Sequence, residues 1–400
     1  MLNELDNNLN KLLEWIENNG FEGWDPYDIQ GSRFYTKYLM KNNKFTFVIL
    51  QKIFRKISFY FPILMRVILG LKPKKNAKAM ALLALSYIKL YKLSNNKKYY
   101  KKYQEIILWL MDNNHSKNKD TLGWGYPFDW HSLIFIPKET PLCVPTVLVG
   151  HALLDEWEIT RNEENIEAIH KIMNFLTTSL NITTIDKENI CFSYSPIDDY
   201  MVINANLYTA SFLTRYGISF KNDTILEQAR KARNFAINQQ EKDGSWPYWS
   251  KLYKSKMPIF VDNYHTGIKL QWLKMCHNID PIANEKEAIE KGTEYYYNNL
   301  FSQDGIPKYR DKVIYPVDIH GPAQAFITFN FLSNSTNLDL VNKVYNFVIK
   351  NMKSKEGYYY YQIDKYGYTS KISYLRWAQA WMLLGLINLK EIKEKKQCVG

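Results

Sequence analysis

The sequence predicts an all-α fold, an (α/α)6 toroid with six inner and six outer helices. Three observations indicate it. Two kinds of helical segment alternate strictly along the chain, they recur at intervals of about 55–60 residues, and long aromatic loops separate each polar helix from the apolar helix after it. Repeats that cannot bury their own apolar faces must stack on their neighbours, and a constant turn per repeat lets the stack close. An open solenoid would show the same alternation.

The outer helices are predicted where apolar residues follow helical spacing and Lys, Glu and Asn occupy the opposite face. These segments are 3–18, 97–113, 162–180, 224–241, 284–300 and 337–352.

The inner helices are predicted where small and apolar residues occupy all faces, as expected for a helix surrounded by other helices. They begin near Ala77, Pro145, Asn204, His265, His320 and Ser373.

The connections from outer to inner helix are long and rich in Gly, Trp, Tyr and Pro, as in "TLGWGYPFDWHSLIF" (121–135), whereas the reverse connections are short. All the long loops of a toroid emerge on the same rim, and long loops usually carry function. We therefore expect the functional site at the mouth of the central cavity.

Composition is compatible with one large domain over residues 1–400, since 46% of the residues are hydrophobic and 15% aromatic. The four cysteines show no CxxC pair and no metal-type spacing, which favours reduced thiols. The polar N-terminal segment does not resemble a secretory signal. We expect a cytoplasmic protein, with peripheral attachment to the inner membrane face as a further possibility.

A basic amphipathic insertion is predicted over residues 29–75. Residues 29–104 contain 18 Lys and Arg but no Asp or Glu, and subtracting them from the net charge of +12 leaves −6 for the rest. Within 44–72, the charges at 52, 55 and 56 lie opposite Phe47, Leu50, Phe54, Ile57 and Phe61. This pattern is typical of a helix lying on an anionic membrane surface, although helices packed over a protein core show the same stripe.

Asp and His recur together where the long loops enter the inner helices, as in "FVDNYH" (260–265) and "YPVDIH" (315–320). A carboxylate beside a histidine can act as acid, base or orienting group, although an aspartate at this position is also a common N-cap. The candidate catalytic residues are Asp129, Asp262, Tyr264, His265, Asp318 and His320.

Aromatic faces interleaved with polar groups suit a sugar, because pyranose rings stack on Trp and Tyr while the hydroxyls need fixed partners. The candidate substrate-binding residues are Trp124, Tyr126, Trp130, His131, Asp198, Asn204, Trp246, Tyr248, Arg310, Gln324, Arg376 and Trp377. Arg310 and Arg376 could hold a carboxylate or phosphate.

The residues leave the reaction open. Asp262 with Asp318 or Asp129 would suit glycoside hydrolysis, whereas Tyr264 and His265 beside Asp262 would suit proton abstraction in β-elimination or C5-epimerisation. The Asp/His pairs could also ligate a divalent cation, but their spacing matches no strong metal motif, so we expect no metal and no cofactor. Nucleic-acid binding is disfavoured because the basic stretch lacks a recognised module.

The helix-pair repeat resembles the (α/α)6-toroid carbohydrate-active enzymes, which include glycoside hydrolases, uronate lyases and glucuronyl epimerases. The stretches "GWDPYD" (23–28), "GWGYPFDW" (123–130), "VGHALLDEW" (149–157), "DNYHTG" (262–267) and "DIHGPAQA" (318–325) resemble a poorly characterised toroid family associated with surface-polysaccharide and glycan assembly. This resemblance implies an enzyme acting on a glycan or lipid-linked oligosaccharide.

A competing resemblance is "QEKDGSW" (240–246), which is similar to the Q-x-x-D-G-x-W pattern of squalene-type terpene cyclases. The pattern occurs once, and the D-x-D-D motif of those enzymes is missing. An isoprenoid enzyme and a non-catalytic glycan-binding scaffold remain the alternatives.

Overall fold

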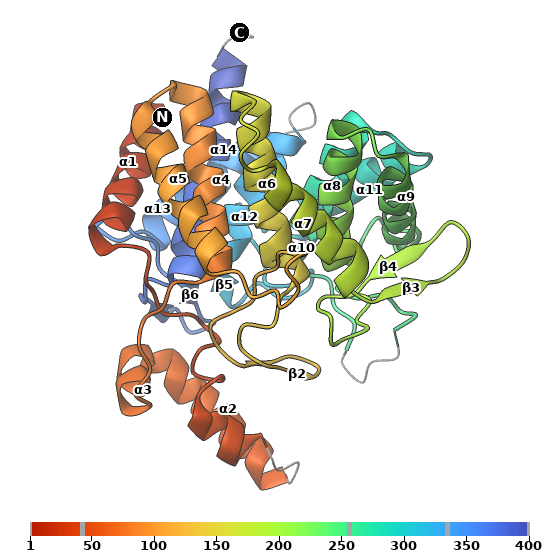
Figure 1. Ribbon diagram of the computed structural model, residues 1–400. Helices are drawn as coiled ribbons and strands as arrows, with labels where there is room; N and C mark the ends of the chain where they lie inside the picture. Colours follow the sequence, from red (N-terminus) through yellow and green to blue (C-terminus); the bar gives the residue numbers. More distant parts are fainter. Residues whose placement is uncertain (1, 41–44, 254–257, 333–336, 398–400) are drawn as a thin grey trace.

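The computed structural model describes residues 2–40, 45–253, 258–332 and 337–397 and forms a closed ring of helix pairs (Figure 1). Each inner helix contacts the next, and the last contacts the first, which closes the ring and excludes an open solenoid. The predicted toroid is confirmed. The inner helices are α4 (Ala77–Ser94), α6 (Cys143–Thr160), α8 (Ile203–Ser219), α10 (Asn263–Ile279), α12 (His320–Phe331) and α14 (Ala380–Gln397), the last preceded by a π-helical turn, η4 (Leu375–Gln379).

The outer helices lie against the inner ring, and all except α1 follow an inner partner along the chain. They are α1 (Leu2–Asn19), α5 (Lys97–Asp112), α7 (Ile166–Asn174), α9 (Asp223–Asn238), α11 (Glu285–Asn299) and α13 (Leu338–Asn351), with a π-helical turn η2 (Phe175–Ser179) extending α7. Helix α1 packs against α14 and so joins the two ends of the chain.

Residue size explains the inner ring. The segment 77–88 at the start of α4 is buried throughout, and its side chains are mostly Ala and Leu, so neighbouring helices can contact it on every side. At Gly150 in α6, an added Cβ would lie 2.4 Å from the ring of Phe212 in α8. Only glycine allows this close approach of two inner helices.

The long loops lie together on the rim at the N-terminal ends of the inner helices, as predicted (Figure 1). They carry three small antiparallel sheets: β1 (Trp130–His131) with β2 (Phe135–Ile136), β3 (Ile182–Thr184) with β4 (Ile190–Phe192), and β5 (Val317–Asp318) with β6 (Gln362–Ile363) and β7 (Thr369–Ser370). The third sheet joins two successive loops and fixes the entry to α12.

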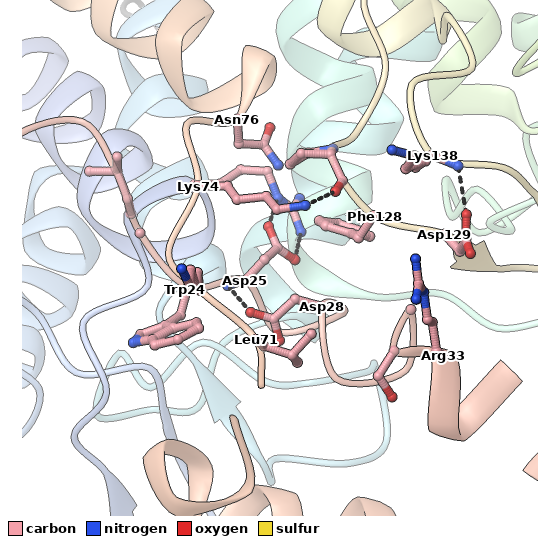
Figure 2. Close-up of a pocket in the computed structure, with 17 residues that line it drawn as sticks. Trp24, Asp25, Asp28, Arg33, Leu71, Lys74, Asn76, Phe128, Asp129 and Lys138 are labelled. Atoms are coloured by element: carbon pink, nitrogen blue, oxygen red, sulfur yellow. Dashed lines mark hydrogen bonds and ion pairs between the residues drawn. The ribbon is translucent and has the colours of Figure 1, made fainter. Parts of the chain in front are cut away.

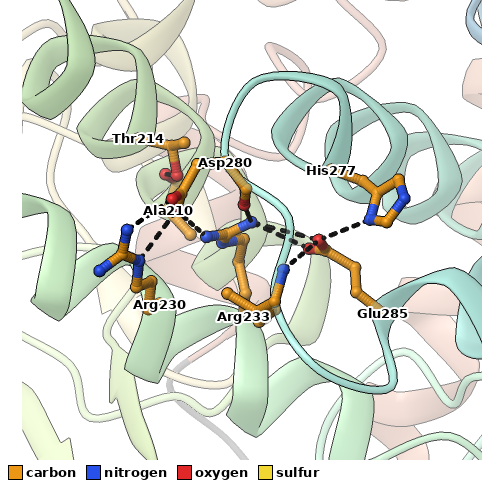
Figure 3. Close-up of polar contacts among 8 residues, drawn as sticks. Ala210, Thr214, Arg230, Arg233, His277, Asp280 and Glu285 are labelled. Carbon is orange, nitrogen blue, oxygen red and sulfur yellow. Dashed lines mark hydrogen bonds and ion pairs between the residues drawn. The ribbon is translucent and has the colours of Figure 1, made fainter.

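The opposite end of the toroid is held by a buried ionic cluster (Figure 3). Arg233 of α9 is fully buried; it ion-pairs with Asp280 and donates to Glu285 Oε1 at 3.1 Å. Arg230 reaches Asp280 at 2.6 Å, and His277 lies 3.2 Å from Glu285. These contacts tie α9 to the α10–α11 connection, far from the loop rim.

The basic segment forms two helices that project from the loop rim, α2 (Phe45–Tyr60) and α3 (Pro62–Ile68), after a π-helical turn η1 (Tyr35–Leu39) (Figure 1). Residues 41–44 of the predicted insertion, and the side chain of Phe47, lie outside the described part. No described helix is long and apolar enough to cross a membrane.

The exposed face of α2 differs partly from the predicted one. Leu50, Ile57 and Phe61 are exposed as expected, but Phe54 is half-buried because its ring packs against Phe34 and Tyr35. The exposed apolar residues of this region are Phe34, Tyr38, Met40, Val48, Ile49, Leu50, Ile53, Ile57, Phe61, Ile63, Leu64, Val67 and Ile68.

Candidate active site

A cavity of about 80 Å³ lies inside the ring at the loop rim. Aromatic side chains form most of its wall, and the polar groups that reach it come from several inner helices and loops. Its lining residues are Tyr27, Lys78, Tyr126, Trp130, Val144, Tyr194, Asn204, Tyr208, Tyr248, Tyr264, His265, Ile268, His320, Arg376 and Trp377.

Asp262 and His265 form a hydrogen-bonded pair at the start of α10. Asp262 caps the helix, with Oδ1 accepting from the backbone N of His265 at 2.9 Å, while Oδ2 lies 2.6 Å from His265 Nδ1. Because an ionised carboxylate can only accept, His265 donates through Nδ1 and presents Nε2 as a lone pair. Burial lowers the pKa of His265, against the raising effect of Asp262, so the imidazole is neutral at neutral pH.

Asp318 supports the next inner helix. It is buried and accepts from the backbone N of His320 at 2.9 Å, from Trp377 Nε1 at 2.8 Å and from Gln362 Nε2 at 3.0 Å. Burial raises its pKa to about 6. Asp318 therefore fixes the start of α12 and the indole of Trp377, and its carboxylate does not line the cavity.

His320 is buried, and neither of its ring nitrogens has a hydrogen-bond partner within the described residues. Its ring is stacked on Tyr264 at 4.6 Å between centroids and lies 4.5 Å from Trp381. Burial holds its pKa well below 6.5. A neutral imidazole without a partner beside a cavity is available to exchange a proton with a bound molecule.

Tyr264 connects the two histidines, because its ring lies 4.0 Å from that of His265 and 4.6 Å from that of His320. The two imidazoles therefore lie on one rim, in the first turns of the neighbouring helices α10 and α12. The structure thus brings Asp262, His265, Asp318 and His320 together on this rim, and of the four only the two histidines line the cavity.

Two cations also reach the cavity. Lys78, in the first turn of α4, is almost fully buried, and burial lowers its pKa to about 7. Arg376 is buried as well; its Nε and Nη2 donate to the two carboxylate oxygens of Asp25. Asp25 thus already neutralises the guanidinium that the sequence assigned to a substrate carboxylate, although Arg376 still lines the cavity.

Several predicted sugar-binding residues are structural instead. Trp124 and Trp246 are fully buried and donate through Nε1 to the carbonyls of Leu110 and Ala236, so each seals a helix pair. Asp198 accepts from Ser195 Oγ and from two backbone amides of its own turn. Gln324 is buried against Gln271 and Thr328. None of these four lines the cavity.

The "QEKDGSW" stretch has a structural role of the same kind. Gln240 donates to the carbonyls of Gly244 and Ala288, and Gly244 has a φ of +88°, which glycine adopts without strain. These contacts bind one loop to α11. They explain the similarity to the terpene-cyclase pattern without isoprenoid chemistry.

Three other candidates lie on the rim outside the cavity. Asp129 accepts from the backbone N of Lys138 and lines a neighbouring pocket. His131 Nε2 lies 3.0 Å from Thr36 Oγ1 and ties its loop to the segment before α2. Arg310 stacks over the ring of Phe260, with its guanidinium carbon 4.4 Å from the centroid.

Six lining residues are not among the candidates from the sequence: Tyr27, Lys78, Val144, Tyr194, Tyr208 and Ile268. Tyr27 lies in the "GWDPYD" stretch, and Tyr194 lies in an aromatic loop, so both carried a signal. Lys78 and Tyr208 lie inside apolar helices, and nothing in one sequence distinguishes them from core positions. Within the described ranges, no group of three or more His, Cys, Asp or Glu side chains is placed to hold a metal ion.

Comparison with known proteins identifies the fold alone. No family model matches the chain, and no curated protein matches its sequence. Among solved structures, cellobiose 2-epimerase from Bacillus thermoamylovorans B4167 aligns with a TM-score of 0.64 at 11% identity, over 80% of this chain and 88% of that one. A D-mannose isomerase aligns with a TM-score of 0.59 at 14% identity, over 80% and 87%. A GH76 α-mannanase from Bacteroides thetaiotaomicron aligns with a TM-score of 0.59 at 10% identity, over 80% and 88%.

Proposed function

We propose that the protein is a carbohydrate-active enzyme that binds a sugar of a glycan in the central cavity. The support is a wall of aromatic faces, including Tyr126, Trp130, Tyr248 and Trp377, interrupted by Asn204 and two histidines. Sugar C–H faces stack on such rings, and amide and imidazole groups bind hydroxyls. The solved structures with this fold include sugar epimerases, sugar isomerases and glycoside hydrolases.

We propose epimerisation as the reaction. The single observation that carries it is the pair of neutral histidines: His265, oriented by Asp262, and His320, without a partner in the described chain. One imidazole removes a proton from the sugar carbon next to a carbonyl or carboxylate group, and the C–H electron pair moves onto that group's oxygen. The second imidazole, although neutral, carries one N–H and donates that proton to the opposite face. The proton taken up by the first imidazole then passes to the second through solvent, which restores both side chains. The reaction is redox-neutral and conserves every atom.

The developing negative charge on the oxygen needs a cation close by. Lys78 and Arg376 are the cations that line the cavity, and Lys78 has no acidic partner among the described residues. We assign to Lys78 the stabilisation of this charge. Arg376, whose charge Asp25 neutralises, forms a fixed part of the wall.

Glycoside hydrolysis would need two carboxylates facing the sugar across the cavity. Asp262 and Asp318 are each engaged by donors from the protein and line no part of the cavity, and Asp129 lies in the neighbouring pocket. The geometry therefore favours proton transfer by histidine. The Asp262, Tyr264 and His265 scheme is retained, with Tyr264 as the ring that positions both imidazoles.

A sugar panel tests the proposal. The wild-type protein would be incubated with reducing disaccharides, monosaccharides and uronic-acid-containing oligosaccharides, and the products separated by chromatography. We expect one epimer to form from one class of substrate and His320→Gln to abolish its formation. Release of shorter saccharides without an epimer would contradict the proposed reaction.

We further propose that the glycan is lipid-linked and that the enzyme works on an anionic membrane surface during surface-glycan assembly. On α2, the exposed apolar residues Ile49, Ile53 and Ile57 lie along one side, and Lys52 and Lys56 lie beside them. Apolar side chains would enter the headgroup boundary while the lysines contact anionic lipid. The absence of Asp and Glu from 29–104 supports the proposal, because a basic surface complements anionic lipid.

Vesicle flotation tests the membrane contact. We expect binding to anionic vesicles at low salt, weaker binding at high salt, and none to neutral vesicles. Ile53→Glu with Val67→Glu should abolish it, whereas Leu108→Glu, at an equally exposed position on α5, should not. Equal flotation of both variants would refute the assignment.

A further inference from the structure

A second pocket, of about 320 Å³, lies on the rim between the first long loop, the segment after α3 and the loop before β1 (Figure 2). It is distinct from the central cavity but shares Arg376 with it. It is lined by Gly23, Trp24, Asp25, Asp28, Gly31, Ser32, Arg33, Leu71, Lys72, Lys74, Asn76, Pro127, Phe128, Asp129, Lys138, Leu375 and Arg376.

Two of the three carboxylates in this pocket are already paired. Asp25 accepts from Arg376, and Asp28 accepts from Arg66 Nε at 3.0 Å and Nη2 at 2.7 Å. Both arginines are buried, so these pairs are permanent parts of the wall. Asp129 is left as the carboxylate without an ionic partner in the described part of the chain.

Four cations at the pocket lack a close acidic partner. Arg33 and Lys72 are exposed and have no partner among the described residues. Lys74 donates to the carbonyl of Pro127 at 3.1 Å, and Lys138 comes no closer than 3.7 Å to exposed Glu139. The pocket therefore carries a net positive charge, with Asp129 as its single opposing group.

Asn76 gives an independent indication of a ligand. It is 95% buried, and its Oδ1 caps α4 by accepting from Lys78 N at 3.0 Å. Its Nδ2 is a buried donor with no acceptor in the described structure, and Asn76 lines the pocket beside Lys74 (Figure 2). A buried donor without a partner is costly, and an anion at the N-terminus of an 18-residue helix would supply the acceptor.

We propose that this pocket binds a phosphate or diphosphate group of the glycan substrate. The inference rests on the proposed function and adds to it the chemical class of the substrate. Asn76 lines this pocket and Lys78, two residues later, lines the central cavity, so a phosphate here would leave its sugar beside the histidines. Leu71 and Lys72 lead directly from the exposed α3, which suits a phosphate attached to a lipid.

Calorimetric titration of the full chain with inorganic pyrophosphate at low salt tests the pocket. We expect Asn76→Ser, which retains a capping oxygen but removes the amide donor, to weaken binding about tenfold, as for one charge-assisted hydrogen bond. Arg33→Gln with Lys72→Gln should weaken it at least as much. Lys101→Gln, an exposed lysine on α5 without a partner among the described residues, is the matched control and should bind as the wild type does.

Two results would overturn the inference: no pyrophosphate binding by the wild type, or equal binding by the wild type and both pocket variants while their melting temperatures match. Because the titration requires no turnover, its failure leaves the sugar reaction untouched, and failure of the sugar panel leaves this site untouched.

Two further arms identify the source of the phosphate. Loss of binding by the pocket variants to vesicles carrying a polyprenyl phosphate, with unchanged binding to phosphatidylglycerol vesicles, would identify a lipid. If the pocket variants lose binding to glucose 1-phosphate but still bind the polyprenyl phosphate vesicles, the ligand is a soluble sugar phosphate. Either result supports the pocket.

Discussion

Replacing Asp262 by asparagine separates its two roles. Asparagine caps a helix as well as aspartate does, so the bond from His265 N to Oδ1 at 2.9 Å is retained. In the second bond, 2.6 Å between Oδ2 and His265 Nδ1, donor and acceptor exchange roles. The amide Nδ2 of asparagine can only donate, so Nδ1 must accept and the imidazole proton moves to Nε2. His265 then presents a proton where the reaction needs a lone pair.

The structure sets the expected magnitudes. Turnover should fall by about 10²–10⁴-fold, the range for loss of a general base or of its correct tautomer. The free energy of unfolding should change by less than about 1 kcal/mol because the cap remains. Asp262→Ala removes the cap and the charged hydrogen bond together, and should cost about 2–4 kcal/mol.

The assay is epimer formation from the sugar found in the panel, together with urea unfolding of each variant. Asp198→Asn is the control, because Asp198 is also a buried aspartate of a rim loop but does not reach the cavity. Asp262→Asn with more than a tenth of wild-type turnover would refute the reasoning. An equal loss with Asp198→Asn would do so as well.

Three further predictions follow from the ionisable groups. The pH profile of kcat/KM should fall on the acid side only well below pH 6.5, because burial lowers the pKa of His320, and on the alkaline side near the Lys78 pKa of about 7; Lys78→Met should remove the alkaline limb. Asp318 keeps its proton up to about pH 6 in the folded state but only to 3.8 in the unfolded state, so the unfolding free energy should decrease by about 2 kcal/mol from pH 4 to 6, and Asp318→Asn should flatten that slope in urea titrations. Arg233→Met removes the buried cation between Asp280 and Glu285, leaving them only Arg230 and His277 as partners, and should lower the unfolding free energy by about 3–5 kcal/mol without changing kcat of the folded enzyme; an unchanged urea midpoint would contradict this.

The sequence predicted the ring because its signal is repeated: the same alternation of apolar and amphipathic helices occurs at every unit. Whether the ring closes could be decided only from the structure, because the contact between α14 and α4 is what distinguishes a toroid from an open solenoid. The gathering of Asp262, His265, Asp318 and His320 was also predictable, because each occupies the junction of a long loop with an inner helix.

Which of these residues line the cavity and which are structural could not be predicted from the sequence. Trp124 and Trp130 lie in the same loop, yet Trp124 is buried against α5 and Trp130 faces the cavity. Which of the two faces the cavity depends on the path of the loop over a few residues. Lys78 is surrounded in sequence by alanine and leucine, so its position beside the cavity depends on the rotation of α4. From the sequence Arg376 was expected to be a free cation, because its partner Asp25 lies 351 residues away along the chain.

Solvent exchange is the most direct test of proton transfer by the two histidines. The protein would be incubated in D2O with the sugar from the panel, and the recovered sugar analysed by proton NMR. We predict deuterium at the single carbon next to the carbonyl or carboxylate group, at a rate that His265→Gln and His320→Gln each reduce by at least 10²-fold. Product formation with no deuterium on any carbon would contradict the account.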